Sequence, residues 1–171
     1  SSGGSDTNVN DVAAIGQTNY QTLQDAVNAA NDGDTITVLK DINNASNITI
    51  NGKKLRIDLN GKTLTQNDIP IPAGSERLSG NVLGVSGGGE LTISNGDIKC
   101  KSDTVFDLSD DSSLNILSGN YTNEKWFIVS DLWPSHGKNL VIGEENGNSI
   151  PTFKFTSEFC DGNYQIIKVY N

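Results

Sequence analysis

Apolar and polar residues alternate along most of the chain, and between residues 82 and 122 the same pattern occurs twice at one fixed offset. The matched positions are Val82 and Val105, Leu83 and Phe106, Val85 and Leu108, Leu91 and Leu114, Ile93 and Ile116, Gly96 and Gly119, and Ile98 and Tyr121. Within each copy the apolar positions have a period of two, as in a strand with one buried face. The repeat therefore predicts two consecutive turns of a solenoid.

The pattern continues on both sides of this repeat, but at longer offsets. The matched pairs are Leu55 with Leu91, Ile57 with Ile93, Leu140 with Leu114, and Ile142 with Ile116. Because these offsets exceed that of the central repeat, inserted loops are predicted at about residues 67–81 and 131–138. Other strands are predicted at residues 12–15, 34–39, 47–50, 62–64, 152–155 and 164–170. The Asn51-Gly52 and Asn60-Gly61 pairs suit turns that require a positive φ.

One segment has helical spacing instead. Its apolar positions are Tyr20, Leu23, Val27 and Ala30. Thr22 can cap the first turn, with Asp25 in the position that a capping pair requires, and residues 31–33 contain the glycine that ends the helix. We expect a helix over about residues 20–32 that covers the open apolar end of the first solenoid turn.

Composition and charge limit the partners. The 171 residues are 35 % apolar and carry a formal net charge of −9. Nucleic acid and anionic membrane surfaces would both be repelled, so neither is predicted as a partner. No apolar run is long enough to span a membrane. The chain has no Met, which indicates a processed protein or an excised piece.

Three segments carry a resemblance to a known architecture. Residues 15–41 resemble the opening of right-handed parallel β-helix modules in secreted and surface-attached bacterial proteins, and residues 51–64 and 91–96 are similar to the strands and turns that follow. These modules have the pectin-lyase-like architecture, and the resemblance covers about residues 12–122. It implies an all-β fold, a single-stranded right-handed parallel β-helix with roughly 23 residues per turn and an N-terminal capping helix. Residues 1–11 are then a flexible tether and residues 12–171 one domain.

The tether suggests how the module is anchored. Its first residues are small and polar, and they resemble the tract that follows the lipidated cysteine of bacterial lipoproteins. The resemblance implies an extracellular or cell-surface location, with lipid attached through a residue upstream of Ser1. A remnant of an expression vector is the alternative.

Candidate metal ligands lie in one acidic segment. Enzymes of the resembled architecture use clustered carboxylates, lyases for calcium and hydrolases near the scissile bond. Asp107, Asp110 and Asp111 could form a weak calcium site, although Asp110 and Asp111 also suit an ordinary turn. The repeat places Asp107 opposite Gly84 and near Ser130, so its carboxylate is not repeated from turn to turn. No other cofactor is predicted.

Candidate ligand-binding residues lie in the second insertion. Trp133 can stack on the apolar face of a sugar ring, with Asp131 and His136 beside it in the sequence. Packing of this loop is the alternative for Trp133, and Trp126, in a continuous apolar run, is predicted to be buried. The resembled hydrolases have a Gly-His-Gly element and paired aspartates, and here only Ser135-His136-Gly137 matches. No catalytic residue is therefore assigned.

The sequence favours Cys100 and Cys160 as unpaired thiols in the core. A disulfide between them is the alternative, and the sequence does not decide between the two.

These observations favour a non-catalytic extracellular module that binds a polysaccharide or surface glycan, or mediates adhesion. The first alternative is a small polysaccharide lyase or glycoside hydrolase, which would need a groove of aligned carboxylates and a basic partner. The second is a purely structural spacer. The oligomeric state is left open by the sequence.

Overall fold

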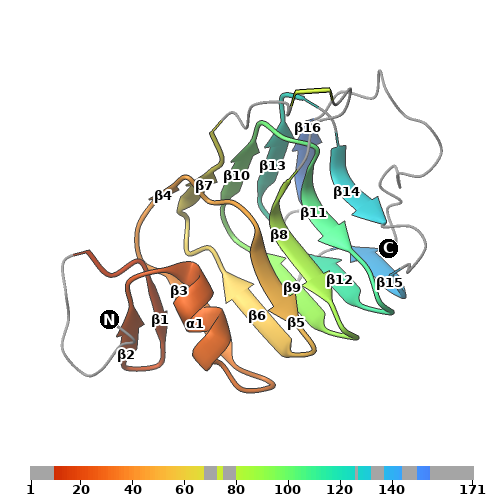
Figure 1. The fold of residues 1–171 in the computed structure, drawn as a ribbon. Helices are drawn as coiled ribbons and strands as arrows, with labels where there is room; N and C mark the ends of the chain where they lie inside the picture. The colour runs from red at the N-terminus through yellow and green to blue at the C-terminus, as the bar shows by residue number, and fades with distance from the viewer. Residues whose placement is uncertain are drawn as a thin grey trace.

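The computed structural model describes residues 10–67, 73–74, 80–125, 127–131, 137–143 and 150–154. Within these ranges the chain forms one helix and many short strands, and its successive coils are stacked from the N-terminal end toward the C-terminal end (Figure 1). In chain order the elements are β1 Ala13–Ile15, β2 Thr18–Tyr20, α1 Leu23–Ala29, β3 Thr35–Val38, β4 Ile42–Asn43, β5 Ile48–Asn51, β6 Lys54–Asp58, β7 Thr63–Thr65, β8 Asn81–Ser86, β9 Glu90–Ser94, β10 Asp97–Cys100, β11 Thr104–Leu108, β12 Ser113–Ile116, β13 Asn120–Asn123, β14 Phe127–Asp131, β15 Asn139–Ile142 and β16 Thr152–Lys154.

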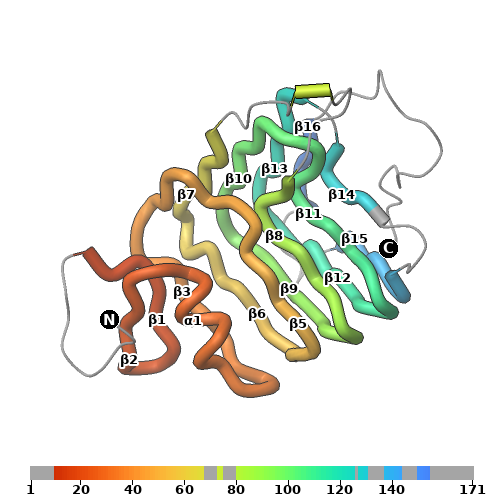
Figure 2. Tube along the Cα trace, viewed as in Figure 1, coloured from red at the N-terminus to blue at the C-terminus, as the bar shows by residue number. Residues whose placement is uncertain are grey.

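Three sheets contain these strands. Sheet A has the order β15-β12-β9-β6-β3-β1-β2, sheet B β16-β13-β10-β7-β4, and sheet C β14-β11-β8-β5. From β3 onward the chain visits sheets A, B and C in that fixed order, and every pairing between successive visits is parallel (Figure 2). The described part of the chain is therefore dominated by parallel β-structure and is compatible with the predicted solenoid.

The predicted repeat sets the strand register. Leu91 pairs with Leu114 and Ile98 with Tyr121, both at the offset of the central repeat. The pairs at longer offsets, such as Leu55 with Leu91 and Leu140 with Leu114, are also confirmed. Most of the two inserted loops lies outside the described residues. Strand β8 begins at Asn81 and β14 ends at Asp131, so each strand takes one terminal residue of the expected loop.

The core is a stack of inward-facing side chains from successive turns. Phe106 and Tyr121 are fully buried, with ring centroids 5.7 Å apart, and Phe153 lies 5.8 Å from Tyr121 in a stacked arrangement. The Tyr121 hydroxyl donates to the carbonyl of Ser118 at 2.6 Å, which satisfies its polar end. Alternation along each strand thus puts one face into a continuous apolar core.

Helix α1 lies within the predicted helical range of 20–32 but is shorter. Thr22 is the N-cap, as predicted, and its Oγ1 accepts a hydrogen bond from the Asp25 N–H at 3.0 Å. Tyr20 is not helical, because it pairs with Ala13 in the antiparallel hairpin of β1 and β2. The helix ends at Ala30, where the backbone becomes extended at ψ 145°. Pairing of Tyr20 with β1 therefore places the first residue of the expected helix in strand β2 instead.

Helix α1 also lies against β5, the edge strand of sheet C. The Gln24 side chain accepts from the Thr49 N–H at 2.8 Å and donates to the Thr49 carbonyl at 3.1 Å, as a neighbouring strand would. Lys53 Nζ donates to the carbonyls of Val27 and Asn28 at the end of the helix, at 2.9 and 2.7 Å. These contacts satisfy polar groups that an edge strand and a helix end otherwise leave open.

Candidate functional site

The corner between sheets A and B forms the candidate site. Here β6, β9 and β12 turn into β7, β10 and β13, through Asn60-Gly61, Asn95-Gly96 and Ser118-Gly119. Asn60, Gly61 and Asn95 have φ of 54°, 72° and 69°, a left-handed conformation that Asn and Gly adopt most easily. Three consecutive turns thus change direction at equivalent positions.

Two glycines let these turns stack closely. A Cβ on Gly96 would lie 2.3 Å from Leu59 Cβ and 2.6 Å from the Lys62 carbonyl oxygen. A Cβ on Gly119 would lie 2.3 Å from the Gly96 carbonyl oxygen. Because glycine has no Cβ, successive turns can approach closely at this corner. The polar side chains on either side of each glycine project outward.

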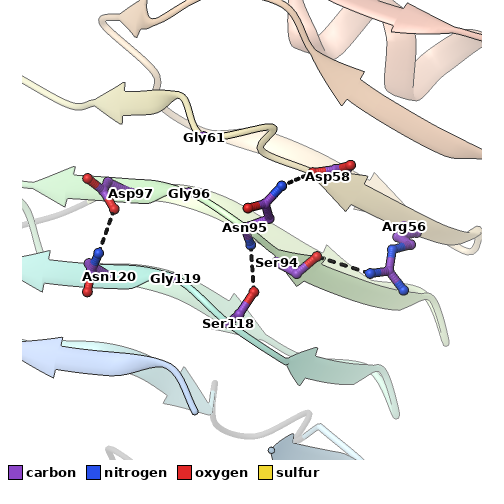
Figure 3. Close-up of a pocket in the computed structure, with 10 residues that line it drawn as sticks. All are labelled: Arg56, Asp58, Gly61, Ser94, Asn95, Gly96, Asp97, Ser118, Gly119 and Asn120. Atoms are coloured by element: carbon purple, nitrogen blue, oxygen red, sulfur yellow. Dashed lines mark hydrogen bonds between the residues drawn. The ribbon is translucent and has the colours of Figure 1, made fainter. Parts of the chain in front are cut away.

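An open polar hollow of about 600 Å³ extends over this corner (Figure 3). Its lining residues are Arg56, Asp58, Gly61, Ser94, Asn95, Gly96, Asp97, Ser118, Gly119 and Asn120. Apart from the glycines, every one of them has a side chain that can donate or accept hydrogen bonds. The hollow crosses successive strands rather than following one strand.

The side chains of the hollow are held by bonds between successive turns. Asn95 Nδ2 donates to Asp58 Oδ1 at 3.1 Å, and Asn120 Nδ2 donates to Asp97 Oδ1 at 2.9 Å. The Arg56 guanidinium donates to Ser94 Oγ at 3.1 Å. These bonds fix the orientation of the groups before a ligand binds, which lowers the entropic cost of binding.

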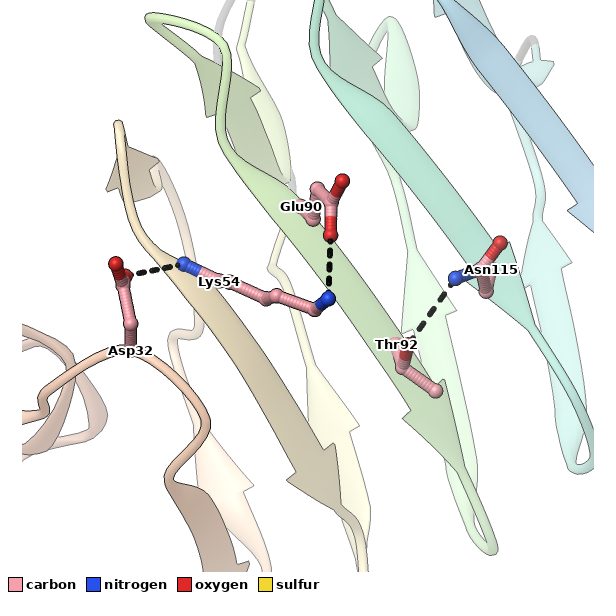
Figure 4. Close-up of polar contacts among 5 residues, drawn as sticks. All are labelled: Asp32, Lys54, Glu90, Thr92 and Asn115. Atoms are coloured by element: carbon pink, nitrogen blue, oxygen red, sulfur yellow. Dashed lines mark hydrogen bonds and ion pairs between the residues drawn. The ribbon is translucent and has the colours of Figure 1, made fainter.

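A second hollow, of about 240 Å³, lies over sheet A and shares Arg56 with the first. Here Lys54 Nζ lies 3.4 Å from Glu90 Oε2, and Asn115 Nδ2 donates to Thr92 Oγ1 at 3.2 Å (Figure 4). We call the lining residues of both hollows the polar track. They include two cations, Lys54 and Arg56, and three anions, Asp58, Glu90 and Asp97, so the formal charge of the track is −1.

The predicted acidic residues are divided between a strand and a turn. Asp107 lies in β11, between Gly84 and Ser130 in register, as the repeat predicts. Asp110 and Asp111 are exposed in the turn after β11, with φ of 53° and 58°. Among the described residues no three His, Cys, Asp or Glu side chains gather where they could hold a metal ion. The structure therefore does not bring these three carboxylates into one cluster, and a calcium site formed by them stays a prediction.

Asp107 occupies an unusual environment for a carboxyl group. Burial raises its pKa from 3.8 to about 6, the hydrogen bond from Asn81 opposes this, and the charge of Asp103 adds to it. Asn81 Nδ2 donates to Asp107 Oδ2 at 2.6 Å. A neutral carboxyl or a bound cation would both relieve the cost of this buried charge.

The other predicted ligand-binding residues are outside the region that can be described. Trp133 and His136 lie outside the described residues, as does Trp126, and only the backbone of Asp131 is described, where it pairs with Leu108. Cys160 is also outside. Cys100 is a buried free thiol whose Sγ donates to Gln66 Oε1 at 3.1 Å, and burial raises its pKa.

Sequence reasoning did not identify the polar track as a site. Its residues are separated in the chain by one turn of the fold, and no local motif connects them. The sequence nevertheless contained a signal. Asp97 and Asn120 occupy matching positions in the two copies of the repeat, as do Asn95 and Ser118, and all four residues are polar. Polar residues that recur with the repeat beside a glycine could have indicated a groove.

Comparison with known proteins leaves the family open. No protein-family model, no curated protein and no solved structure matches the chain. In the described part of the chain, α1 falls far short of the length and apolar character that a membrane-crossing helix needs.

Proposed function

We propose that this chain is a right-handed parallel β-helix of the pectin-lyase-like class, with α1 as its N-terminal cap. The cyclic order of the three sheets supports this, because parallel strands joined by crossovers are almost always connected in the right-handed sense. The contacts of Gln24 with Thr49 support the capping role of α1, since they occupy the free edge of sheet C. The resemblance in residues 15–41 points to the same architecture.

The function we propose is non-catalytic carbohydrate binding along the polar track. The observation that carries it is the hollow of about 600 Å³ lined by amide, hydroxyl, carboxylate and guanidinium groups from successive turns. Sugar hydroxyls both donate and accept hydrogen bonds, so they match a surface that offers both. The ordered side chains of Asn95 and Asn120 supply donors and acceptors in fixed positions.

The shape and charge of the track favour an extended, neutral glycan. Equivalent positions recur at about 4.8 Å, the spacing of neighbouring strands, so a polymer lying across the strands meets similar groups at each turn. Two cations and three anions line the track, which gives little attraction for a polyanion. The chain as a whole, at −9, would add further repulsion.

An extracellular setting belongs to this proposal. It is supported by the resemblance to secreted and surface-attached bacterial modules and by the polar residues at the start of the chain, which would serve as the tether of a lipid-anchored protein. In that setting the module would mediate adhesion to a surface glycan.

Affinity electrophoresis tests the binding function. The parent, Asn120→Ala and Arg56→Ala would be run in native gels that contain neutral polysaccharides such as xylan, mannan or β-glucan. Asn43→Ala is the matched control, because Asn43 is exposed on β4 and does not line the track. We expect one polymer to retard the parent and the control, with retardation at least about fivefold weaker in the two track variants, as for the loss of one hydrogen bond to the ligand.

Three other outcomes would change the conclusion. Retardation that survives in both track variants but is lost in Trp133→Ala would move the site to the loop predicted from the sequence. Shortening of a polymer during incubation would favour the enzyme alternative. Absence of retardation by every polymer would contradict carbohydrate binding and favour a structural spacer.

A further inference from the structure

The outward face of sheet B carries a regular row of side chains beside the polar track. Strand register puts Thr65, Lys99, Thr122 and Lys154 opposite one another on β7, β10, β13 and β16. Lys99 is exposed between two buried neighbours on β10, and Lys154 is exposed on β16, so the row faces solvent. We call these residues the lysine row.

The lysine row runs parallel to the part of the polar track that lies on sheet B. Asp97 and Asn120 line the larger hollow, and each lies two residues before a member of the row on the same strand (Figure 3). Two residues of a strand span about 6.6 Å and point to the same face of the sheet. A side group on a sugar bound at the track could therefore reach the row.

The charges of the row are not used within the described part of the chain. Lys99 and Lys154 form no hydrogen bond or ion pair with any described residue. Asp97 lies on the same face as Lys99, but its carboxylate accepts a hydrogen bond from Asn120 Nδ2 at 2.9 Å instead. Both ammonium groups are thus available to an anionic group of a ligand.

The spacing of the two lysines limits what that ligand can be. Threonine and lysine alternate along the row, so Lys99 and Lys154 are two strand spacings apart, about 9.6 Å. In a flat, cellulose-like glycan each sugar advances by about one strand spacing, and successive sugars are turned over relative to each other. Side groups on one side of such a chain recur at every second sugar, which is the separation of the two lysines.

We propose that the polar track and the lysine row together bind a cellulose-like glycan with a neutral main chain and acidic side groups. This inference rests on the carbohydrate-binding function proposed above and names the class of ligand. The neutral main chain lies along the track, and carboxylates on every second sugar pair with Lys99 and Lys154. Exposed ion pairs contribute little free energy, so the row selects between related glycans while the track supplies most of the affinity.

Two polymers that differ only in charge test the inference. Xanthan of low molecular mass has a cellulose main chain with an acidic side chain on every second glucose, and carboxyl reduction makes these side chains neutral. Isothermal titration calorimetry of the full chain with each polymer at low salt gives the two dissociation constants. We expect xanthan to bind about fivefold more tightly than its reduced form. The preference should decrease as NaCl is added, because salt screens exposed charges.

Variants of the lysine row locate the preference. Lys99→Gln and Lys154→Gln each remove one charge, and Lys138→Gln is the matched control, because Lys138 is exposed just before β15 in sheet A. We expect each row variant to lower the preference from about fivefold to about twofold. The double variant Lys99→Arg/Lys154→Arg and the control should keep it. The reduced polymer should bind all variants equally, since none of them alters the track.

The two proposals fail in different ways. Equal binding of xanthan and its reduced form by the parent would overturn this inference and leave carbohydrate binding standing, and so would a preference that survives loss of both lysine charges. Absence of binding to either xanthan, while a neutral polymer retards the parent in native gels, would overturn it as well. Absence of binding to every polymer would contradict the carbohydrate function and this inference with it.

Discussion

Gly119→Ala should be among the most destabilising small substitutions in this fold. Gly119 has φ of 111°, and a Cβ there would lie 2.3 Å from the carbonyl oxygen of Gly96 in the preceding turn. That oxygen also accepts the Asn120 N–H at 2.9 Å, so the two turns cannot separate without weakening a backbone hydrogen bond. The clash is between backbone and Cβ, and no flexible side chain can absorb it.

The expected cost follows from three terms. A positive φ costs an L-residue about 1–2 kcal/mol. Relief of the clash requires a shift of about 1 Å, and overpacking of this kind costs about 1–3 kcal/mol. Weakening the hydrogen bond to Gly96 adds about 0.5–1.5 kcal/mol. We therefore expect the free energy of unfolding to fall by about 2.5–6.5 kcal/mol.

Gly61→Ala is the matched control. Gly61 occupies the equivalent place two turns earlier, with φ of 72°, but no atom lies within 4 Å of its added Cβ. Only the backbone term remains, so the expected loss is about 1–2 kcal/mol. The difference between the two variants isolates the close stacking of the corner from the conformational cost.

Urea unfolding followed by circular dichroism measures both losses. With a slope of about 2 kcal/mol per M, Gly119→Ala should lower the midpoint by about 1.3–3.3 M and Gly61→Ala by about 0.5–1 M. Equal losses in the two variants would refute the reasoning, because they would mean that the turns are not stacked as closely as the 2.3 Å separation requires.

Two other substitutions test the core. Phe106→Ala should lower the free energy of unfolding by about 3–5 kcal/mol in the same urea assay, because it leaves a cavity in the fully buried stack, and a loss below about 1 kcal/mol would contradict that packing. In a Cys160→Ser background, the Cys100 thiol should react with Ellman's reagent at pH 8 only after addition of urea, since burial both shields it and raises its pKa, and rapid reaction of the folded protein would show that Cys100 is accessible.

The sequence predicts the repeated strands in the middle of the fold better than the structure at its N-terminal end. The register between Leu91 and Leu114 follows from a strict period of two combined with a fixed repeat, because a slip by one residue would expose every buried side chain. Tyr20 shows the opposite case. Its spacing with Leu23 fits a helix, but pairing with Ala13 in the β1–β2 hairpin places it in a strand. Such a tertiary contact is not visible in local periodicity.

The candidate sites depend on tertiary structure in the same way. Asp107 and Ser130 could be placed side by side from the repeat alone, and the structure confirms this. The contact of Asn81 with Asp107 could not be placed, because Asn81 lies at the end of the expected insertion, where the repeat gives no register. The polar track is distributed over turns that are distant in sequence, so only the fold brings Arg56 and Asn120 to one hollow.

Fold and candidate function depend on different atoms of the same corner. Gly96 and Gly119 have no side chain to offer a ligand, but they allow the turns to stack, and this stacking sets the spacing of the polar groups beside them. The polar groups themselves contribute little to stability, because exposed pairs such as Lys54 with Glu90 are worth at most about 1 kcal/mol. Substitution of a track side chain should therefore change binding while stability stays nearly unchanged, whereas substitution of Gly119 should lower stability and also disturb the spacing of the track. This separation is what allows the electrophoresis experiment to assign a loss of retardation to the site rather than to unfolding.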